Sequence, residues 1–127
     1  MLTYKELLDN PTNTYAAQGN ALVNLCAGIA KESGWDSKPV DVPCALMLTV
    51  SELAEGMEGH RKDLMDDKLK HHPMLHVELA DAVIRIFHLA GRLNVPLGDV
   101  IVEKLHFNTR RIDHTPEHRA SAGGKKY

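Results

Sequence analysis

The stretch from Pro43 to Arg61, PCALMLTVSELAEGMEGHR, decides the fold of this chain. Its apolar residues recur every three or four positions, which is the period of one face of an α-helix. Asp41 stands just before the stretch as a capping residue, and Pro43 occupies a position that the first helical turn tolerates. We therefore expect a helix that ends near Arg61. Its apolar positions are Leu46, Met47, Val50, Leu53, Ala54 and Met57.

Three further helices extend outward from this one. Gly34 can end the helix that precedes it, and Pro73 and Pro96 separate the helices that follow. No stretch alternates apolar and polar residues over a useful length, so no β-strand is expected. The sequence predicts an all-α, four-helix bundle-like domain over residues 1–112. A flexible tail is expected over residues 113–127, where apolar residues are almost absent. The further helices are expected at residues 12–32, 75–93 and 97–111.

The composition agrees with one small helical domain. The chain has 127 residues, of which 43% are apolar and only 5% aromatic, so aliphatic side chains must fill its core. Its formal net charge of −2 excludes a polycation that binds nucleic acid. The N-terminal segment lacks the apolar core of a signal peptide, and no stretch reaches the ~18 apolar residues of a membrane span. We expect a soluble, cytoplasmic protein that binds neither membranes nor nucleic acid polymers.

Four carboxylates stand out on two of the expected helices. Glu52 and Glu55 lie three residues apart on one helix, and Glu78 and Asp81 repeat this spacing on the next. Residues i and i+3 share one helix face, and a short connection makes the two helices antiparallel neighbours. If the two faces meet, four negative charges share a small space, which divalent cations would neutralise. A set of oxygen ligands suits Mg²⁺ or Mn²⁺, and these cations serve the chemistry of polyphosphates.

Solvated acidic faces are the alternative interpretation of the same residues. On a helical wheel Glu52 and Glu55 point away from the main apolar stripe of their helix. Asp81 lies four residues before Arg85, which is the spacing of an ordinary ion pair on a helix surface. A single E-x-x-E pair favours this alternative, because charged helices are common. Two such pairs on successive helices shift the balance toward a metal site.

A stripe of polar residues follows on the last expected helix. Lys104, Asn108 and Arg111 are spaced i, i+4 and i+7, so they lie along one side. Two cations and an amide can hold phosphate groups from the side opposite to the metals. The alternative is a solvated basic turn, which the dipole of the helix favours at its C-terminus.

Three blocks of the chain together resemble a known family, the MazG-like all-α nucleoside-triphosphate pyrophosphohydrolases. The family pattern is E-x-x-E, a variable spacer, E-x-x-D, and then a Lys and an Asn on a later helix. Here Glu52, Glu55, Glu78 and Asp81 carry the acidic part, and Lys104 and Asn108 follow. The resemblance covers roughly Pro43 to Arg111. The blocks are SELAEGMEGHRK (51–62), HVELADAVIRIFHLAGRL (76–93) and EKLHFNTRR (103–111).

The resemblance implies an activity and an assembly. Members hydrolyse a nucleoside triphosphate between the α and β phosphates, which yields a nucleoside monophosphate and pyrophosphate. They work as dimers or tetramers, in which a neighbouring subunit completes the helical bundle. The four carboxylates would bind Mg²⁺, with Mn²⁺ as the alternative cation. A water activated by the metal and oriented by Glu52 or Glu55 would attack the α-phosphorus, while Lys104, Asn108 and Arg111 stabilise the phosphate charges.

Two residues outside these blocks are candidates for contact with the base of the nucleotide. Trp35 offers an aromatic face for stacking, and Gln18 offers an amide for hydrogen bonds. For Trp35 the alternative is a packing role at the end of a helix. The N-terminal third shows no clear match to a base-selecting pocket, so the preferred nucleotide stays open.

Two other classes of protein compete with the pyrophosphohydrolase. A ferritin-like di-iron carboxylate bundle requires two E-x-x-H motifs, and only Glu103 and His106 have this spacing. A non-enzymatic helical module that binds a partner would leave the acidic pairs as surface decoration. A bound iron chromophore would favour the first alternative. Binding that survives mutation of the acidic pairs would favour the second.

Overall fold

The computed structural model describes residues 1–127, apart from the side chain of Ile112. Every named element of the described chain is helical, so the expected all-α class is confirmed. The four expected helices correspond to α2 to α5, and their ends lie within three residues of the expected positions. Helices α1, η1 and α6 were not anticipated; η1 and α6 lie where we expect a flexible tail, whose flexibility stays a prediction. The elements are α1 (Tyr4–Asp9), α2 (Tyr15–Glu32), α3 (Val42–Arg61), α4 (Met74–Arg92), α5 (Leu97–Arg110), η1 (Ile112–His114) and α6 (Pro116–Ala120).

Local signals set the ends of the helices. The side chain of Asp41 accepts a hydrogen bond from the backbone N–H of Cys44 at 3.0 Å, so the expected cap of α3 is confirmed. Gly34 ends α2 with a φ of 86°, and the N–H groups of Gly34 and Trp35 bond back to carbonyls of the last turn. This ending requires a residue that tolerates positive φ, which is the ordinary reason for glycine there. It also places Trp35 directly after the helix.

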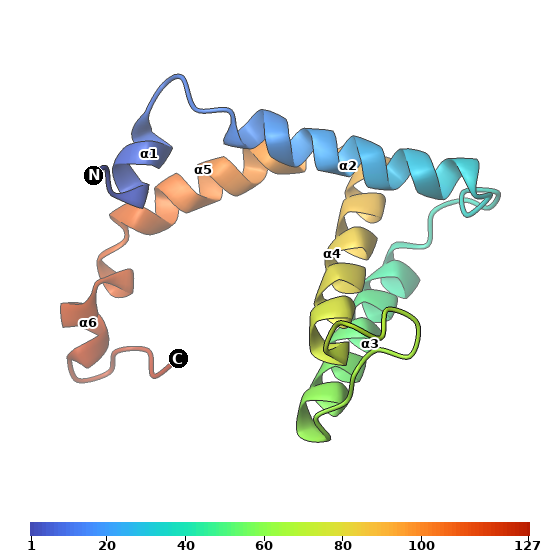
Figure 1. Ribbon diagram of the computed structural model, residues 1–127. Helices are drawn as coiled ribbons and strands as arrows, with labels where there is room; N and C mark the ends of the chain where they lie inside the picture. Colours follow the sequence, from blue (N-terminus) through green and yellow to red (C-terminus); the bar gives the residue numbers. More distant parts are fainter. The chain divides into compact units, whose positions relative to one another are not determined.

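The chain divides into two compact units, Leu22–Val95 and Met1–Ala21 together with Pro96–Tyr127. In the unit Leu22–Val95, α3 and α4 form an antiparallel hairpin (Figure 1). Asp66 closes the loop between them, since its carboxylate accepts hydrogen bonds from the backbone N–H groups of Lys68 at 3.0 Å and Leu69 at 2.7 Å. The connection is short enough to hold the two helices side by side, as expected.

Small and acidic residues, rather than large apolar ones, make the contact between α3 and α4. The buried residues of α3 are Thr49, Glu52, Gly56 and Gly59, spaced about one turn apart. A Cβ atom added to Gly56 would lie 3.3 Å from the Cβ of Glu78, so the backbone of α3 approaches α4 closely at this point. The absence of a side chain at Gly56 therefore lets the carboxylates of the two helices come together.

The large apolar residues of the hairpin lie on a different side and remain exposed. On a helical wheel, the apolar residues of each helix lie about a quarter turn away from the residues that contact the other helix. Because the two helices are antiparallel, these two sets of apolar residues share one side of the hairpin. We call these seven residues the apolar stripe; each is between 43% and 59% exposed. Among the described side chains, the buried apolar residues are Leu8, Val23, Ala82 and Ala90. The stripe consists of Leu46, Val50, Leu53 and Met57 on α3 and Leu79, Val83 and Ile86 on α4.

In the other unit, α5 begins against the first part of α2. The side chain of Asn20 accepts a hydrogen bond from the N–H of Gly98 at 2.8 Å and donates one to Asp99 at 2.6 Å. A Cβ atom at Gly98 would lie 2.1 Å from the carbonyl oxygen of Ala16, so only glycine fits. None of the helices in the described part of the chain has the length and apolar character needed to cross a membrane.

Candidate metal centre and adjoining pocket

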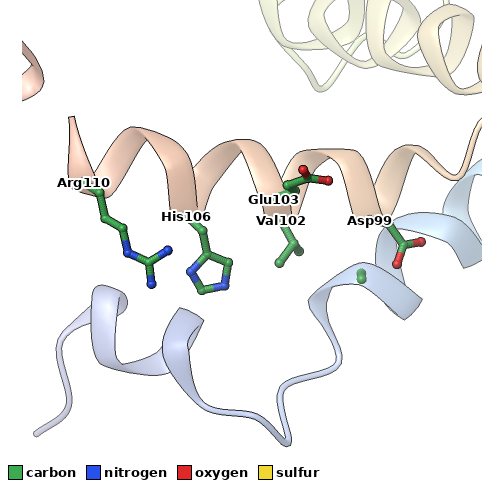
Figure 2. A pocket seen from close by; sticks show the side chains of 6 residues that line it. Asp99, Val102, Glu103, His106 and Arg110 are labelled. Carbon is green, nitrogen blue, oxygen red and sulfur yellow. The ribbon is translucent and has the colours of Figure 1, made fainter.

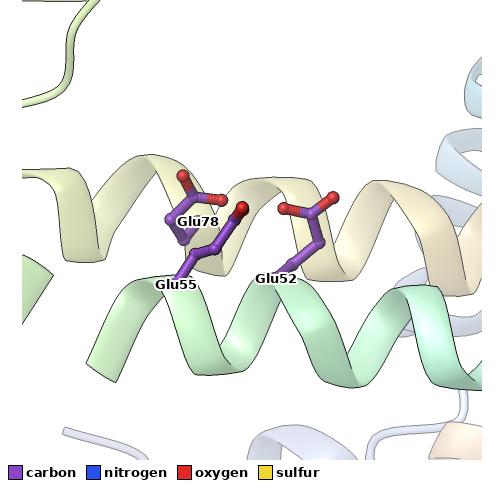
Figure 3. Close-up of side chains that lie close together, drawn as sticks. All are labelled: Glu52, Glu55 and Glu78. Atoms are coloured by element: carbon purple, nitrogen blue, oxygen red, sulfur yellow. The ribbon is translucent and has the colours of Figure 1, made fainter. Parts of the chain in front are cut away.

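Three of the four predicted carboxylates meet between α3 and α4. Ligand oxygens of Glu52, Glu55 and Glu78 all lie within 4.8 Å of one another. Figure 3 shows the Glu55 side chain of α3 directed toward Glu78 of α4, with Glu52 one turn along the same helix. Among the described residues, this is the one group of three or more His, Cys, Asp or Glu side chains close enough to share a metal ion. We call it the carboxylate cluster.

Glu78 has the most perturbed acidity in the cluster. Burial raises its pKa to about 7, and the hydrogen bond to Glu52 and the charges of Glu55, Glu52 and Asp81 act in the same direction. The residue is only 8% exposed, and its Oε2 atom is buried without a hydrogen-bond partner. An ionised carboxylate in this position has no protein cation of its own. It requires either a proton or a positive charge from outside the chain.

Asp81 lies next to the cluster rather than within it. Burial raises the pKa of Asp81, and the charge of Glu52 raises it further. Its carboxylate is not among the oxygens within 4.8 Å of one another, although it contributes to the raised pKa of Glu78. The structure therefore gathers the predicted set into three adjoining carboxylates and a fourth that acts on them through its charge.

Among the described side chains, one cation, Arg85, contacts the cluster. Its Nε donates a hydrogen bond to Glu52 Oε1 at 2.6 Å. Burial opposes the ionised form of Glu52, but the hydrogen bonds from Arg85, Glu78 and Glu55 outweigh it, and the pKa of Glu52 is lowered. The expected surface pair between Asp81 and Arg85 is replaced by this bond across the two helices.

These residues fit a hard divalent cation. All donors of the cluster are carboxylate oxygens, as Mg²⁺ and Mn²⁺ prefer, and a soft thiol or an imidazole is not among them. The buried, unpartnered Oε2 of Glu78 is the specific feature that a cation would satisfy. One guanidinium does not balance three carboxylates and Asp81, so the site keeps a negative charge at neutral pH.

A pocket of about 760 Å³ adjoins the cluster within the unit Leu22–Val95. Such a volume lies in the range of small-molecule sites, about 300–1,000 Å³. Apolar side chains, cations and two of the predicted carboxylates line it together. The wall includes Ile29, Leu48, Leu89, Arg85 and Arg92, along with Glu52 and Asp81.

An ion-pair network holds the loop after α2 against α4 beside this pocket. His88 Nε2 lies 2.7 Å from Asp36 Oδ1, and Arg92 Nε lies 3.4 Å from the same oxygen. A terminal nitrogen of Arg92 also donates to the backbone carbonyl of Lys38 at 2.6 Å. The loop that carries Trp35 is thereby fixed along the wall of the pocket.

The two candidates for base contact lie in different places. Trp35 lines the pocket and is 75% exposed, so its ring is available for stacking and is not a core packing residue of this chain. Gln18 belongs to the other unit, is exposed, and donates a hydrogen bond to Thr14 Oγ1 at 2.7 Å. The structure therefore places Trp35, but not Gln18, in the unit of the carboxylate cluster.

The polar stripe of α5 also belongs to the other unit. Lys104 and Arg111 flank the ring of Phe107, with their charged groups 4.8 Å and 5.5 Å from its centroid. Arg111 pairs with Asp113, and the Oδ1 atom of Asn108 is buried without a hydrogen-bond partner. Lys104 and Asn108 lie four residues apart on α5, as expected, but Arg111 follows the last residue of the helix and has an extended backbone, so the expected stripe of three is wrong at its end. A role toward the phosphates of a substrate stays a prediction.

A second, more open pocket runs along α5 (Figure 2). His106 points from α5 toward α1, where its Nδ1 lies 3.1 Å from Asp9 Oδ1, whereas the carboxylate of Glu103 points away from His106. The E-x-x-H residues thus do not converge on one point. This arrangement does not favour the di-iron alternative.

Three contributors to the site are not evident from the sequence. Arg85 was assigned to Asp81 because both lie on one helix, and only the packing of α3 on α4 reveals its bond to Glu52. The sequence does not show why residue 56 is a glycine, because the reason is its close approach to Glu78 on the other helix. The contact between Asp36 and His88 joins residues 52 positions apart, and no local pattern signals it.

Comparison of the chain with protein-family models, curated proteins and solved structures finds no significant match. The resemblance to the MazG-like family therefore rests on the sequence blocks quoted above.

Proposed function

We propose that this chain is a Mg²⁺-dependent nucleoside-triphosphate pyrophosphohydrolase, which releases a nucleoside monophosphate and pyrophosphate. The observation that carries the proposal is the carboxylate cluster with its buried, unpartnered Glu78 oxygen. Its position beside a pocket of nucleotide size supports the same conclusion. The ordered motif blocks, which resemble those of the MazG-like family, supply the reaction class.

Each residue of the cluster has a distinct part in this proposal. Glu78 and Glu52 are buried and hold the cation, while Asp81 adds negative charge from the next turn of α4. Glu55 is exposed, so its carboxylate is open to water and can orient one and accept its proton. Bound Mg²⁺, or Mn²⁺, supplies charge neutralisation of the phosphates and activation of water.

The pocket accounts for the organic part of the substrate. Its apolar wall and the exposed ring of Trp35 suit a base and a sugar, and Arg92 and Arg85 suit negatively charged groups near them. Lys104, Asn108 and Arg111 remain candidates for phosphate contact, and Gln18 for base contact, on the grounds of sequence alone. Nothing in the pocket selects one base over another.

We propose further that a second copy of this chain covers the apolar stripe. Its seven half-exposed side chains present on the order of 600 Å² of apolar surface, at the upper end of the range for the largest patch of a typical monomer, about 300–600 Å². A standard interface buries about 800 Å² on each partner, so one copy of similar shape would suffice. The stripe lies on the side of the hairpin that is not occupied by Glu55, which leaves the cluster accessible. Dimers, or tetramers formed from them, agree with the resemblance.

The reaction is tested by product analysis. Purified protein is incubated with a panel of ribo- and deoxyribonucleoside triphosphates, with Mg²⁺ or with EDTA, and the products are separated by ion-exchange chromatography. We expect monophosphate and pyrophosphate only in the presence of the metal. Diphosphate and phosphate would contradict the assigned bond. The absence of any product would favour the alternative of a partner-binding module.

A matched pair of variants connects the reaction with the cluster. Glu55→Gln removes a carboxylate from the cluster, whereas Glu58→Gln removes one from the next turn of α3, where Glu58 pairs with Lys62 at 2.5 Å. Both lie on the same helix, and neither is buried, so they share the charge change and the risk to folding. Only Glu55→Gln should abolish turnover.

A further inference from the structure

Arg85 lies at the junction between the carboxylate cluster and the pocket. Its Nε bonds to Glu52 Oε1 at 2.6 Å, and its side chain lines the pocket together with Glu52 and Asp81. The side chain is 41% exposed, so a ligand in the pocket can reach it. A guanidinium carries five N–H donors, and the bond to Glu52 uses one of them. Arg85 therefore has donors left for a second anion.

The ion pair is half-buried, since the side chain of Glu52 is only 11% exposed. Arg85 therefore offsets part of the cost of burying this carboxylate in the metal-free chain. The same contact has a large effect on the cluster, since it occupies a carboxylate that a divalent cation would need. It also places one positive charge where a second, doubly charged cation would have to bind.

We propose that Arg85 acts as a counter-ion latch, holding Glu52 until a divalent cation takes that carboxylate and then donating to the phosphate chain of a nucleotide in the pocket. The inference rests on the proposed function, because it assumes that the pocket takes a nucleoside triphosphate. Two physical facts support the exchange. A divalent cation at Glu52 repels the guanidinium, and the planar fork of arginine matches the oxygens of a phosphate group.

The latch makes two predictions of opposite sign for one substitution. Replacing Arg85 by a neutral residue removes the competitor for Glu52, so a divalent cation should bind more tightly. The same substitution removes a phosphate donor, so a triphosphate should bind more weakly. A residue with a merely structural role would weaken both or change neither.

The experiment measures Mn²⁺ binding by electron paramagnetic resonance, without nucleotide, for the full chain and three variants. Arg85→Gln should bind Mn²⁺ about threefold to tenfold more tightly, the factor typical of a partly screened charge pair. Arg85→Lys keeps the charge and should fall between this variant and the unmodified chain. Arg61→Gln is the control: its side chain is 66% exposed and 3.8 Å from Glu58, so it loses the same charge away from the cluster.

The second measurement uses an α,β-imido nucleoside triphosphate, which resists cleavage at the proposed bond, in the presence of saturating Mn²⁺. Its affinity should fall about tenfold in Arg85→Gln, as for the loss of one charge-assisted phosphate contact, and should be unchanged in Arg61→Gln. Equal or weaker Mn²⁺ binding by Arg85→Gln would overturn the latch. Unchanged affinity for the analogue would overturn it as well.

The failure of the latch and the failure of the proposed function give different results. If the unmodified chain cleaves nucleoside triphosphates but Arg85→Gln shows neither change, the latch alone is wrong. If the opposite changes in Mn²⁺ and analogue binding occur but no nucleotide is cleaved, the latch stands and the proposed reaction is wrong.

Discussion

In the α3–α4 hairpin, the side of α3 that contacts α4 differs from the side that carries the apolar stripe. Together the two sides reverse the ordinary distribution of polar and apolar residues. Toward α4, the helix α3 buries Thr49, Glu52, Gly56 and Gly59. Away from that contact, it exposes the large side chains of the apolar stripe, of which Leu53 is 49% and Met57 is 59% exposed. A helix of an isolated globular protein does the opposite, with its apolar side in the core.

Each side has an energetic cost that the single chain leaves uncompensated. Buried carboxylates are unfavourable unless they are paired, and Arg85 pairs with only one of them. Exposed aliphatic surface is unfavourable in proportion to its area, at about 25 cal/mol per Å². We infer that the two sides await different partners, a cation for the carboxylate cluster and a second copy for the stripe. The predictions below separate these two explanations.

The largest effect is expected on the acidic side. Glu78→Gln removes a buried carboxylate of the cluster and should lower kcat/KM for a nucleoside triphosphate at least about a hundredfold, since ligand loss exceeds the 10–100-fold cost of losing an outer-shell partner. The oligomeric state, measured by light scattering, should not change. Glu58→Gln serves as the control and should keep turnover within about twofold, as for a surface substitution. Loss of the oligomer in Glu78→Gln would mean that the two sides are not independent.

A charge placed in the apolar stripe should weaken the dimer. Leu53→Asp places a carboxylate in the middle of the stripe, and burying it in an interface should raise the dissociation constant of the dimer by roughly tenfold to a hundredfold. Sedimentation velocity over a concentration series measures this shift. Leu69→Asp is the matched control, because Leu69 is 51% exposed but lies in the loop between α3 and α4. Equal behaviour of the two variants would remove the stripe as the interface.

Gly56 tests how closely the two helices must approach. In Gly56→Ala the new Cβ would lie 3.3 Å from the Cβ of Glu78, so α4 must shift by a few tenths of an ångström and carry Glu78 with it. We expect about a tenfold loss of Mn²⁺ affinity, because metal sites tolerate little displacement of a ligand. Gly28→Ala is the control, since its Cβ would meet nothing within 4 Å. That variant should keep its Mn²⁺ affinity and gain helix stability of about 0.5–1 kcal/mol.

Periodicity and capping predicted the regular part of the fold. Asp41, Gly34 and the apolar spacing of α3 carry local information, so the helix ends were found within a few residues. The short helix α1 was missed although Thr3 and Glu6 form a capping box, because six residues offer too little periodicity to reveal a helix.

The candidate site could be predicted only in part. Spacing brought Glu52 and Glu55 onto one side of a helix, but their distance from Glu78 depends on how closely α3 approaches α4. Sequence periodicity also identified the apolar positions without saying whether this chain buries them itself. The bond of Arg85 to Glu52 and the network around Asp36 join different elements, and no rule of local spacing reaches that far.

The smallest expected effect is the dependence of folding stability on the pKa of the buried Glu78. The pKa of Glu78 is raised from 4.5 to about 7, so the folded state binds its proton more tightly than the unfolded chain does. The free energy of unfolding of the metal-free protein should therefore fall as the pH rises from about 4.5 to about 7, by on the order of 1 kcal/mol after allowance for solvent screening. Urea denaturation across this range measures the change.

Glu78→Gln isolates this contribution, because its neutral amide cannot titrate. The difference in stability between the two proteins should depend on pH between about 4.5 and 7 and level off on either side. Mn²⁺ should act in the opposite direction, since ligation requires the ionised carboxylate and its affinity rises with pH through this range. If the stability of the metal-free protein depended on pH in the same way as that of Glu78→Gln, the pKa of Glu78 would not be raised in the folded state. The cluster would then hold no carboxylate that calls for a cation. The contrast between the two sides of the hairpin would then rest on the apolar stripe alone.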